Sequence, residues 1–250
     1  MKYILDSGFR RNDEAGRNDV SKIFNLGLAS GSTPKKTYAA LAKLVKERGL
    51  NLSKLHCFHL DEYVGLSSKD PRSFVFCLYN DVVDSLGLKK EQVTFWRGEA
   101  PNRPEECRRY QEDIRRHGGI DCQILGLGIN GHIGFNEPGS LKESRCRVVK
   151  LTEETLQHNA KDLQGGLMPT QALTMGIADI LDAKTILLLV SGKNKTESLR
   201  RFLEEKESPA YPASFLKGHK NLTVIADQDA VNGLEVDVIA NPFRGEAISR

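Results

Sequence analysis

Residues 121–140 bring a histidine, a carboxylate and an amide together in one glycine-rich stretch, with His132, Glu137 and Asn130 as its candidate side chains for chemistry. An imidazole titrates near neutral pH, because its ordinary pKa is about 6.5. Such a group beside a carboxylate is suited to moving protons to and from a bound molecule. A glycine-rich turn with a surface histidine remains the alternative, because most loops only connect other elements.

A buried strand is the element expected to hold this stretch. Ile124, Leu125 and Leu127 form a short apolar run that is typical of such a strand. The glycines that follow allow the chain to turn sharply or to approach a ligand closely. In open α/β sheets, ligands bind outside the carboxyl ends of the strands, and the three polar side chains are expected at that place.

An acidic pair follows a second predicted strand. Residues 55–60 form this strand and lead directly into Asp61 and Glu62. Two carboxyl groups at the end of a core strand are costly to bury without a purpose. A carboxyl in a partly dry cleft has a raised pKa and can act as a base. A solvated turn is the alternative for this pair taken alone.

Two further loops are suited to binding an anion. Residues 30–33 join a predicted strand at 23–28 to a helix with Thr33 as its expected N-cap and Gly49 as its C-cap. Free backbone N–H groups and the helix dipole converge at such a place and attract anions. A second strand-to-helix loop, residues 191–196, carries two lysines. An ordinary capping turn is the alternative for residues 30–33.

Strands alternate with helices along most of the chain. This alternation predicts a three-layer α/β/α fold, in which a mostly parallel, Rossmann-like sheet has helices on both faces. Residues 21–250 are expected to form one domain, because no linker long or polar enough divides them. Residues 1–20 are expected to form a degenerate or disordered segment with a short strand at 1–5, because the remainder is polar and lacks apolar periodicity.

The composition argues against several classes of protein. The net charge is only +3 over 250 residues, which argues against a dedicated nucleic-acid binder. No apolar run reaches membrane-spanning length and no secretory signal is visible, so we expect a soluble protein without a membrane partner. The five cysteines have no CxxC spacing, which favours reduced thiols in the cytoplasm over a disulfide frame or a zinc site.

The order of these motifs resembles that of the glucosamine-6-phosphate deaminases, within the larger sugar-phosphate isomerase and lactonase superfamily. The resemblance rests on five blocks, GLASGSTP at 27–34, LDEYVGL at 60–66, GLGINGHIGFNEPGS at 126–140, ALTMGIADILDA at 172–183 and SGKNKTESL at 191–199. It extends over residues 23–230, and GHIGFNEP is a highly specific string. Residues 6–20 depart from the family, because they are too short and too polar for its usual long amphipathic helix.

The resemblance implies that glucosamine 6-phosphate and water react to give fructose 6-phosphate and ammonia. His132 would open the sugar ring, and Glu137 would assist by orienting the imidazole and stabilising its cation. Asp61 would take the proton from C2 and return one to C1, and Glu62 would help to position the substrate. Asn130 stands where family members carry Asp or Asn, and an amide can hold the histidine by a hydrogen bond but cannot act as a base.

The resemblance also implies a phosphate site, formed by Ser30, Gly31, Ser32, Thr33, Lys161 and Lys195. Lys161 stands where the family often has an arginine, and a lysine offers a point charge instead of a planar fork. We expect this exchange to weaken binding modestly, or to matter little if Lys195 dominates. No metal and no cofactor are implied. The implied partner is a small sugar phosphate, and self-association is open because family members occur as monomers and as larger assemblies.

Three other functions stay open on the sequence alone. A 6-phosphogluconolactonase belongs to the same superfamily but needs no base at C2, and the DEY and FNEP motifs argue against it. An enzyme for galactosamine 6-phosphate would differ only in recognition of the C4 hydroxyl, which the sequence does not separate. A non-catalytic sugar-phosphate sensor usually carries a helix-turn-helix, which residues 1–20 do not show. The presence of Asp61, His132 and Glu137 favours catalysis over sensing.

Overall fold

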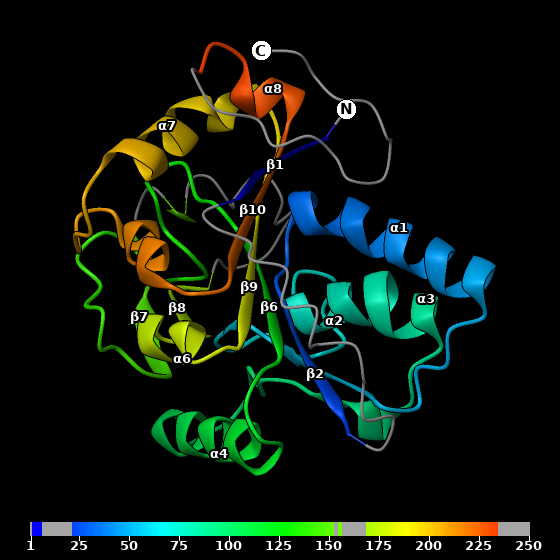
Figure 1. Ribbon diagram of the computed structural model, residues 1–250. Helices are drawn as coiled ribbons and strands as arrows, with labels where there is room; N and C mark the ends of the chain where they lie inside the picture. Colours follow the sequence, from blue (N-terminus) through cyan, green and yellow to red (C-terminus); the bar gives the residue numbers. More distant parts are fainter. Residues whose placement is uncertain (1, 7–21, 153–154, 157–168, 235–250) are drawn as a thin grey trace.

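The computed structural model describes residues 2–6, 22–152, 155–156 and 169–234, which form two sheets and the helices packed against them (Figure 1). The larger sheet has seven strands in the order β1-β10-β9-β6-β2-β3-β5. β1 runs antiparallel to β10, and the other neighbours in this sheet are parallel. Its strands are β1 (Lys2–Asp6), β2 (Phe24–Leu28), β3 (Leu55–His59), β5 (Val93–Thr94), β6 (Cys122–Gly126), β9 (Thr185–Val190) and β10 (Leu222–Asp227).

Helices cover both faces of the large sheet (Figure 1). One face carries α1 (Ser32–Arg48), α2 (Phe74–Leu78), the π-helical turn η2 (Tyr79–Val83) and α3 (Asp84–Leu86). The other face carries α4 (Arg103–Arg116), α6 (Ile177–Leu181), α7 (Thr196–Glu204), the 3-10 helix η5 (Pro212–Gly218) and α8 (Gln228–Val231). Two short 3-10 turns are η3 (Lys90–Gln92) and η4 (Lys193–Lys195). The predicted three-layer α/β fold with a mostly parallel sheet is confirmed.

The smaller sheet begins almost where β3 ends. It is antiparallel and consists of β4 (Asp61–Tyr63), β8 (Gln171–Thr174) and β7 (Arg147–Lys150), with β8 in the middle. Residues 171–174 are apolar enough for a buried helix turn, but they pair with two strands, and the helix begins only at Ile177.

Helix α1 ends as predicted but begins two residues earlier than predicted. Gly49, the C-cap, has φ and ψ of 58° and 38°, and its N–H donates to Lys46 O. At the other end Gly31, and not Thr33, is the N-cap, and the helix starts at Ser32. Gly31 has a φ of 107°, which a glycine adopts without strain, so the chain enters the helix almost directly after β2.

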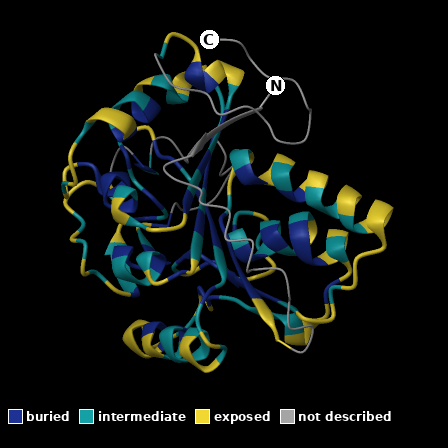
Figure 2. Cartoon of the chain, viewed as in Figure 1, coloured by how far each residue is buried: buried dark blue, intermediate teal, exposed yellow. Residues whose placement is uncertain are grey.

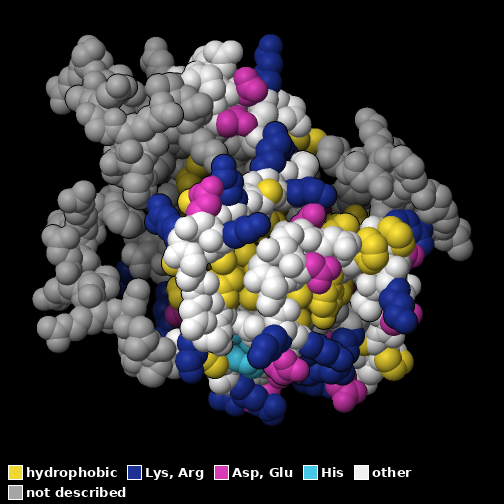
Figure 3. Space-filling view, turned by 90° about the vertical axis from the view of Figure 1, so that its right-hand side faces the viewer, with side chains coloured by type: hydrophobic (Ala, Val, Ile, Leu, Met, Phe, Trp, Pro, Cys, Tyr) yellow, Lys and Arg dark blue, Asp and Glu magenta, His cyan; other side chains and the backbone are white. Residues whose placement is uncertain are grey.

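Helix α1 is buried along one side only, as Figure 2 shows. Of its residues, Pro34 and Tyr38 are buried. Figure 3 looks onto this side of the molecule and shows apolar side chains at the surface among charged ones. Large apolar side chains on α1, just after its C-cap and around the start of β2 are 43–50% exposed, namely Leu44, Leu50, Ile23 and Phe24. Residues 7–20, for which we predicted a degenerate or disordered segment, lie outside the described residues.

The parallel strands end at one edge of the large sheet, and four polar segments meet there. Residues 29–33 follow β2, residues 60–61 follow β3, residues 127–137 follow β6 and residues 191–195 follow β9. All five cysteines are unpaired thiols, and Cys57 is buried in the core. Within the described ranges, no helix is both long and apolar enough to cross a membrane.

A buried histidine makes the fold sensitive to acid. Burial, and then the charge of His117 stacked on it, lower the pKa of His56 to about 4. The pKa of an unfolded histidine is about 6.5, so between these two values only the unfolded chain binds the proton. The stability that neutral His56 contributes is therefore complete above pH ~6.5 and is lost as the pH falls toward 4.

We expect the His56→Gln variant to lose about 2 kcal/mol less stability than the wild type between pH 7 and pH 5. Urea unfolding of both proteins at the two pH values measures this difference. The carboxyl groups that titrate over the same range contribute equally to both proteins, so their contribution cancels in the comparison. His219→Gln is the control, because His219 is partly exposed and lies outside the histidine stack. A variant with the same pH dependence as the wild type would contradict the assignment.

Candidate active site

A chain of hydrogen bonds joins the three polar side chains of the loop after β6. His132 Nδ1 lies 2.7 Å from Asn130 Oδ1, and because a carbonyl oxygen only accepts, the imidazole donates this bond. Asn130 Nδ2 donates to Glu137 Oε2 at 2.9 Å, and that oxygen lies 3.7 Å from His132 Nδ1. With its proton on Nδ1, the neutral imidazole has its lone pair on Nε2, which can take a proton from a bound molecule.

Thr155 extends this chain, and the sequence analysis did not name it. Its hydroxyl donates to Glu137 Oε1 at 2.5 Å, so both oxygens of Glu137 have a protein donor. Thr152 Oγ1 accepts from Thr155 N at 3.2 Å, an arrangement typical of a helix N-terminus. The spacing of the two threonines signals such a terminus, but it does not reveal which side chain reaches Glu137.

Two glycines make room for the histidine loop. A Cβ on Gly128 would lie 2.4 Å from ring atoms of His132, and a Cβ on Gly131 would lie 2.3 Å from the Tyr211 ring. Gly131 also has a φ of 86°, which favours glycine. Gly128 N donates to His132 O at 2.9 Å, so the loop folds back on itself around the imidazole. The glycines therefore allow the rings of His132 and Tyr211 to approach the backbone of the loop closely.

Asp61 lies at the start of β4 and is only 6% exposed. Burial, and then the charge of Glu62, raise the pKa of Asp61 to about 8, while a hydrogen bond with the Ser30 side chain opposes the rise. A carboxyl with a pKa near neutrality exchanges its proton readily at working pH, which suits a general base. Ser30, expected at the phosphate site, thus also connects that loop to Asp61.

Contacts join Asp61 to the histidine loop. Across the small sheet Asp61 pairs with Thr174, whose hydroxyl accepts from Phe135 N at 3.3 Å. A Cβ on Gly134 would lie 3.1 Å from the side chain of Leu60, so the loop packs directly on the end of β3. The structure therefore brings Asp61 and the chain of hydrogen bonds from His132 to the same edge of the sheet.

Glu62 faces a different part of the molecule. Its carboxylate accepts hydrogen bonds from the Ser73 hydroxyl and from the backbone N–H groups of Tyr63, Phe74 and Val75. Both oxygens are thus occupied by donors of the protein. Glu62 was expected to help position the substrate, but its hydrogen bonds join β4 to the start of α2, so any effect on the substrate would be indirect.

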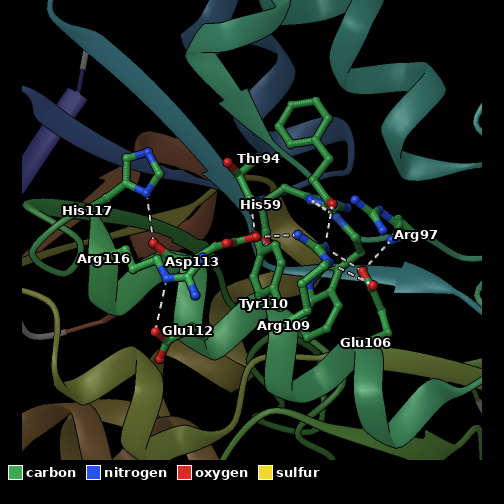
Figure 4. Close-up of polar contacts among 12 residues, drawn as sticks. His59, Thr94, Arg97, Glu106, Arg109, Tyr110, Glu112, Asp113, Arg116 and His117 are labelled. Atoms are coloured by element: carbon green, nitrogen blue, oxygen red, sulfur yellow. Dashed lines mark hydrogen bonds and ion pairs between the residues drawn. The ribbon is translucent and has the colours of Figure 1, made fainter.

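A polar network centred on α4 holds the end of β3, the strand that leads into Asp61 (Figure 4). Arg109 on α4 forms an ion pair with Glu106 and donates to Phe95 O at 3.1 Å. The Tyr110 hydroxyl donates to His59 O and accepts from His59 N at 2.8 Å. Helix α4 thereby holds both the segment after β5 and the end of β3, so Asp61 continues from an anchored strand.

The expected phosphate site has two described parts. Residues 31–33 form the N-terminus of α1, where the N-cap has no side chain that could satisfy the first N–H groups. Lys195 ends η4 and is half-buried, and the described residues offer no acceptor to its Nζ. Burial lowers the pKa of Lys195, and an anion would compensate a desolvated ammonium group. Lys161, the remaining predicted phosphate residue, lies outside the described residues.

Asp227, which the sequence analysis did not assign to the site, holds the turn that carries Lys195. Its carboxylate accepts from the Ser191 hydroxyl at 2.5 Å and from Gly192 N at 3.0 Å. Ser198 in α7 then donates to Ile129 O at 2.8 Å and ties this region to the histidine loop. Contacts therefore join the acidic pair, the histidine loop and the two loops expected to bind phosphate.

A model of the family described as glucosamine-6-phosphate isomerases/6-phosphogluconolactonase matches residues 12–225. The chain belongs to this family. Its resemblance to the deaminases, inferred from the five sequence blocks, is confirmed by several curated relatives that are 40–46% identical.

Within the glucosamine-6-phosphate isomerase/6-phosphogluconolactonase family, the chain is 46% identical over 219 residues to a glucosamine-6-phosphate deaminase of Shouchella clausii, covering 86% of this chain and 88% of that protein. It is 43% identical to glucosamine-6-phosphate deaminase 1 of Bacillus subtilis, covering 83% and 86%. A solved structure described as a monomeric glucosamine-6-phosphate deaminase has a TM-score of 0.80 at 43% identity, covering 83% and 86%. A 6-phosphogluconolactonase from Thermotoga maritima, at 22% identity and a TM-score of 0.65 over 82% and 85%, shares the fold.

The arrangement offers two separate proton-transfer groups and an anion site at one edge of the sheet. Asp61 can take and return a proton, and His132 can do so independently through Nε2. In the described part of the chain, no three His, Cys, Asp or Glu side chains are placed to hold a metal ion. Two titratable groups beside a loop suited to anions are an arrangement that fits acid–base catalysis on an anionic substrate.

Proposed function

We propose that the chain is a glucosamine-6-phosphate deaminase, which converts D-glucosamine 6-phosphate and water into D-fructose 6-phosphate and ammonia. Relatives that are 40–46% identical over most of the chain carry this name. The family model also covers 6-phosphogluconolactonases, which makes lactone hydrolysis the second candidate.

The observation that carries the proposal is the pair of proton-transfer groups, Asp61 and His132, on separate elements at one edge of the sheet. Opening a sugar ring and moving a proton between two carbons are distinct steps that need proton transfer at different substrate atoms. A lactonase has no need of a base at C2. The buried Asp61, with its raised pKa, favours the deaminase.

In the first step, His132 Nε2 takes the proton of the anomeric hydroxyl and delivers a proton to the ring oxygen, and the bond between C1 and that oxygen breaks. Glu137 and Asn130 hold the imidazole from the Nδ1 side, through contacts of 2.7 Å to Asn130 and 3.7 Å to Glu137. The carboxylate stabilises the imidazolium that forms between the two transfers. The product of this step is the open-chain aldehyde.

In the second step, Asp61 removes the proton from C2, which forms an enolate that keeps the amino group on C2. Return of this proton to C1, with transfer of an N–H proton to O1, converts the intermediate into an imine at C2 with a hydroxyl on C1. Water then adds to C2, and the nitrogen leaves as ammonia, which gives the ketose phosphate. One carboxyl with a pKa near neutrality can perform both transfers, because at working pH it takes up a proton about as readily as it releases one.

Incubation of the purified protein with glucosamine 6-phosphate tests the proposal, with ammonia and fructose 6-phosphate measured together. We expect the two products in equal amounts. Galactosamine 6-phosphate serves as the epimeric substrate, and 6-phosphogluconolactone as the alternative one. A folded protein that hydrolyses the lactone and releases neither product from the amino sugar would overturn the proposal, and binding without turnover would favour a sensor.

The Lys195→Ala variant is expected to raise KM for glucosamine 6-phosphate about tenfold to a hundredfold and to change kcat by less than about threefold. The lost contact is a charge-assisted bond to phosphate, worth about 1.5–3 kcal/mol, and it is equally present before and during the chemical step. Steady-state kinetics measure both constants. Lys193→Ala is the matched control, because Lys193 lies exposed in the same turn. An equal rise in KM for both variants would refute a specific role of Lys195.

The proposed reaction belongs to the breakdown of amino sugars, including the N-acetylglucosamine route, and it is formally a hydrolysis because water displaces the amine. A reducing compartment such as the cytoplasm suits the five unpaired thiols. The assembly state stays a prediction, and a described relative is monomeric. Size-exclusion chromatography with light scattering measures it.

A further inference from the structure

Asp61 and Glu62 are neighbouring carboxyl groups with opposite surroundings. Successive side chains of a strand point to opposite sides, so Asp61 contacts Ser30 while Glu62 contacts the start of α2. Both are buried, with 6% and 1% of the residue exposed. Two buried acids beside one another repel when both are ionised, so their surroundings decide which of them keeps its proton.

The surroundings of Glu62 favour its ionised form. Its carboxylate accepts from the Ser73 hydroxyl at 2.6 Å, Tyr63 N at 2.7 Å, Val75 N at 2.8 Å and Phe74 N at 3.2 Å. The three backbone N–H groups only donate, and two of them belong to the first turn of a helical segment whose dipole attracts negative charge. Burial raises the pKa of Glu62, and these four donors oppose the rise.

The surroundings of Asp61 stabilise a negative charge much less than those of Glu62. Within the described residues, Ser30 is the hydrogen-bond donor to its carboxyl. Two other titratable groups face the acidic pair, Tyr38 from α1 and Cys77 from α2, and burial raises the pKa of each, so both stay neutral in the physiological range. The segment after β5 approaches Glu62 at Gly98, which has no charge, since a Cβ there would lie 3.2 Å from Glu62 Cγ. Glu62 is thus the fixed charge nearest to Asp61.

We propose that Glu62 is a positioning residue that acts through Asp61, and that its fixed negative charge behind β4 strengthens the hold of Asp61 on the proton carried between the two substrate carbons. This inference rests on the proposed function. Without Glu62, the Asp61 carboxylate would be a weaker base, because nothing would oppose its ionisation except burial. The charge of Glu62 is effective because four donors prevent it from moving away or taking up the proton itself.

The Glu62→Gln variant tests this in the pH profile of kcat/KM, which reports the free enzyme. We expect its acid limb to lie at least one pH unit below that of the wild type. The substrate titrates identically in both assays, so the difference belongs to the enzyme. Ser73→Ala is the matched control, because it removes one donor to Glu62 but leaves the charge, and its acid limb should not move downward. Equal profiles for Glu62→Gln and the wild type would overturn the inference.

A second measurement does not depend on activity. The native Asp61 keeps its proton up to about pH 8 while the unfolded residue releases it near 3.8, so Asp61 makes stability fall as the pH rises between these values. The difference in unfolding free energy between the wild type and Asp61→Asn measures that fall. In a Glu62→Gln background the fall should end at least one pH unit lower, and an unchanged end point contradicts the inference. If the Gln variant does not fold, Glu62→Met removes the same charge. A protein that is inactive on amino sugars would contradict the proposed function, whereas the stability measurement would still test the effect of Glu62 on Asp61.

Discussion

Replacing Asp61 with Asn is expected to lower kcat about a thousandfold and, at pH 8, to stabilise the fold by about 2 kcal/mol. Asn keeps the shape of the side chain and can still bond to Ser30, but it cannot take the proton from C2. The gain in stability follows from burial, because native Asp61 must either hold a proton or carry an unfavourable charge. Loss of activity with a gain in stability is the signature of a strained catalytic group and not of a structural one.

Steady-state kinetics and urea unfolding at pH 5 and pH 8 measure the two effects. The stability gain should be larger at pH 8, because the cost of Asp61 grows as the pH rises from 3.8 toward 8. Asp84→Asn is the control, since Asp84 is an exposed acid on α3, and neither property should change by more than a small factor. A destabilised variant with an intact kcat would show that Asp61 serves the fold alone.

The Gly128→Ala variant is expected to lower kcat about a hundredfold while leaving the rest of the fold in place. The added Cβ would lie 2.4 Å from the His132 ring, which must therefore rotate or shift. A displacement of about 1 Å in a catalytic group costs about two orders of magnitude in rate. The ring would also leave Asn130 Oδ1, which fixes its tautomer through a bond of 2.7 Å.

Gly126→Ala provides the matched control for this variant. Gly126 lies two residues earlier, at the end of β6, and a Cβ there meets nothing within 4 Å. We expect its kcat to stay within about twofold of the wild type, and circular dichroism should show the same helix content for both variants. Equal losses in the two variants would mean that the strand, and not the space beside His132, is sensitive to the extra methyl group.

The sequence predicted the large sheet and the loops at its carboxyl edge, because these follow from local patterns. Apolar runs mark β2, β6 and β9, and small polar residues follow each of them. The small sheet was not predicted, because the pairing of Asp61 with Thr174 joins segments that are distant in sequence. Residues 171–174 are apolar enough for a strand or a buried helix turn, and only their partners decide between the two.

The candidate site was predicted by residue type, but its internal contacts were not. Asp61, His132 and Glu137 stood out as titratable groups near strand ends. Thr155, by contrast, matters only because it meets Glu137, and a threonine in a helix start carries no such signal by itself. Glu62 shows the converse, since its position beside Asp61 suggested contact with the substrate while its partners lie in α2. Side-chain direction and long-range partners, which decide both cases, are properties of the folded chain.

Residues 2–6 pair with residues 223–227, so β1 joins the sheet through a loop that spans nearly the whole described chain. Closing such a loop costs entropy before any contact repays it, so β1 is expected to dock after the parallel strands have assembled. Its register sets Lys2 opposite Asp227, the residue that holds Gly192 and with it the turn of Lys195. We therefore expect the strand edge beside the phosphate end of the site to be the last part to form in refolding, after the rest of the sheet is in place.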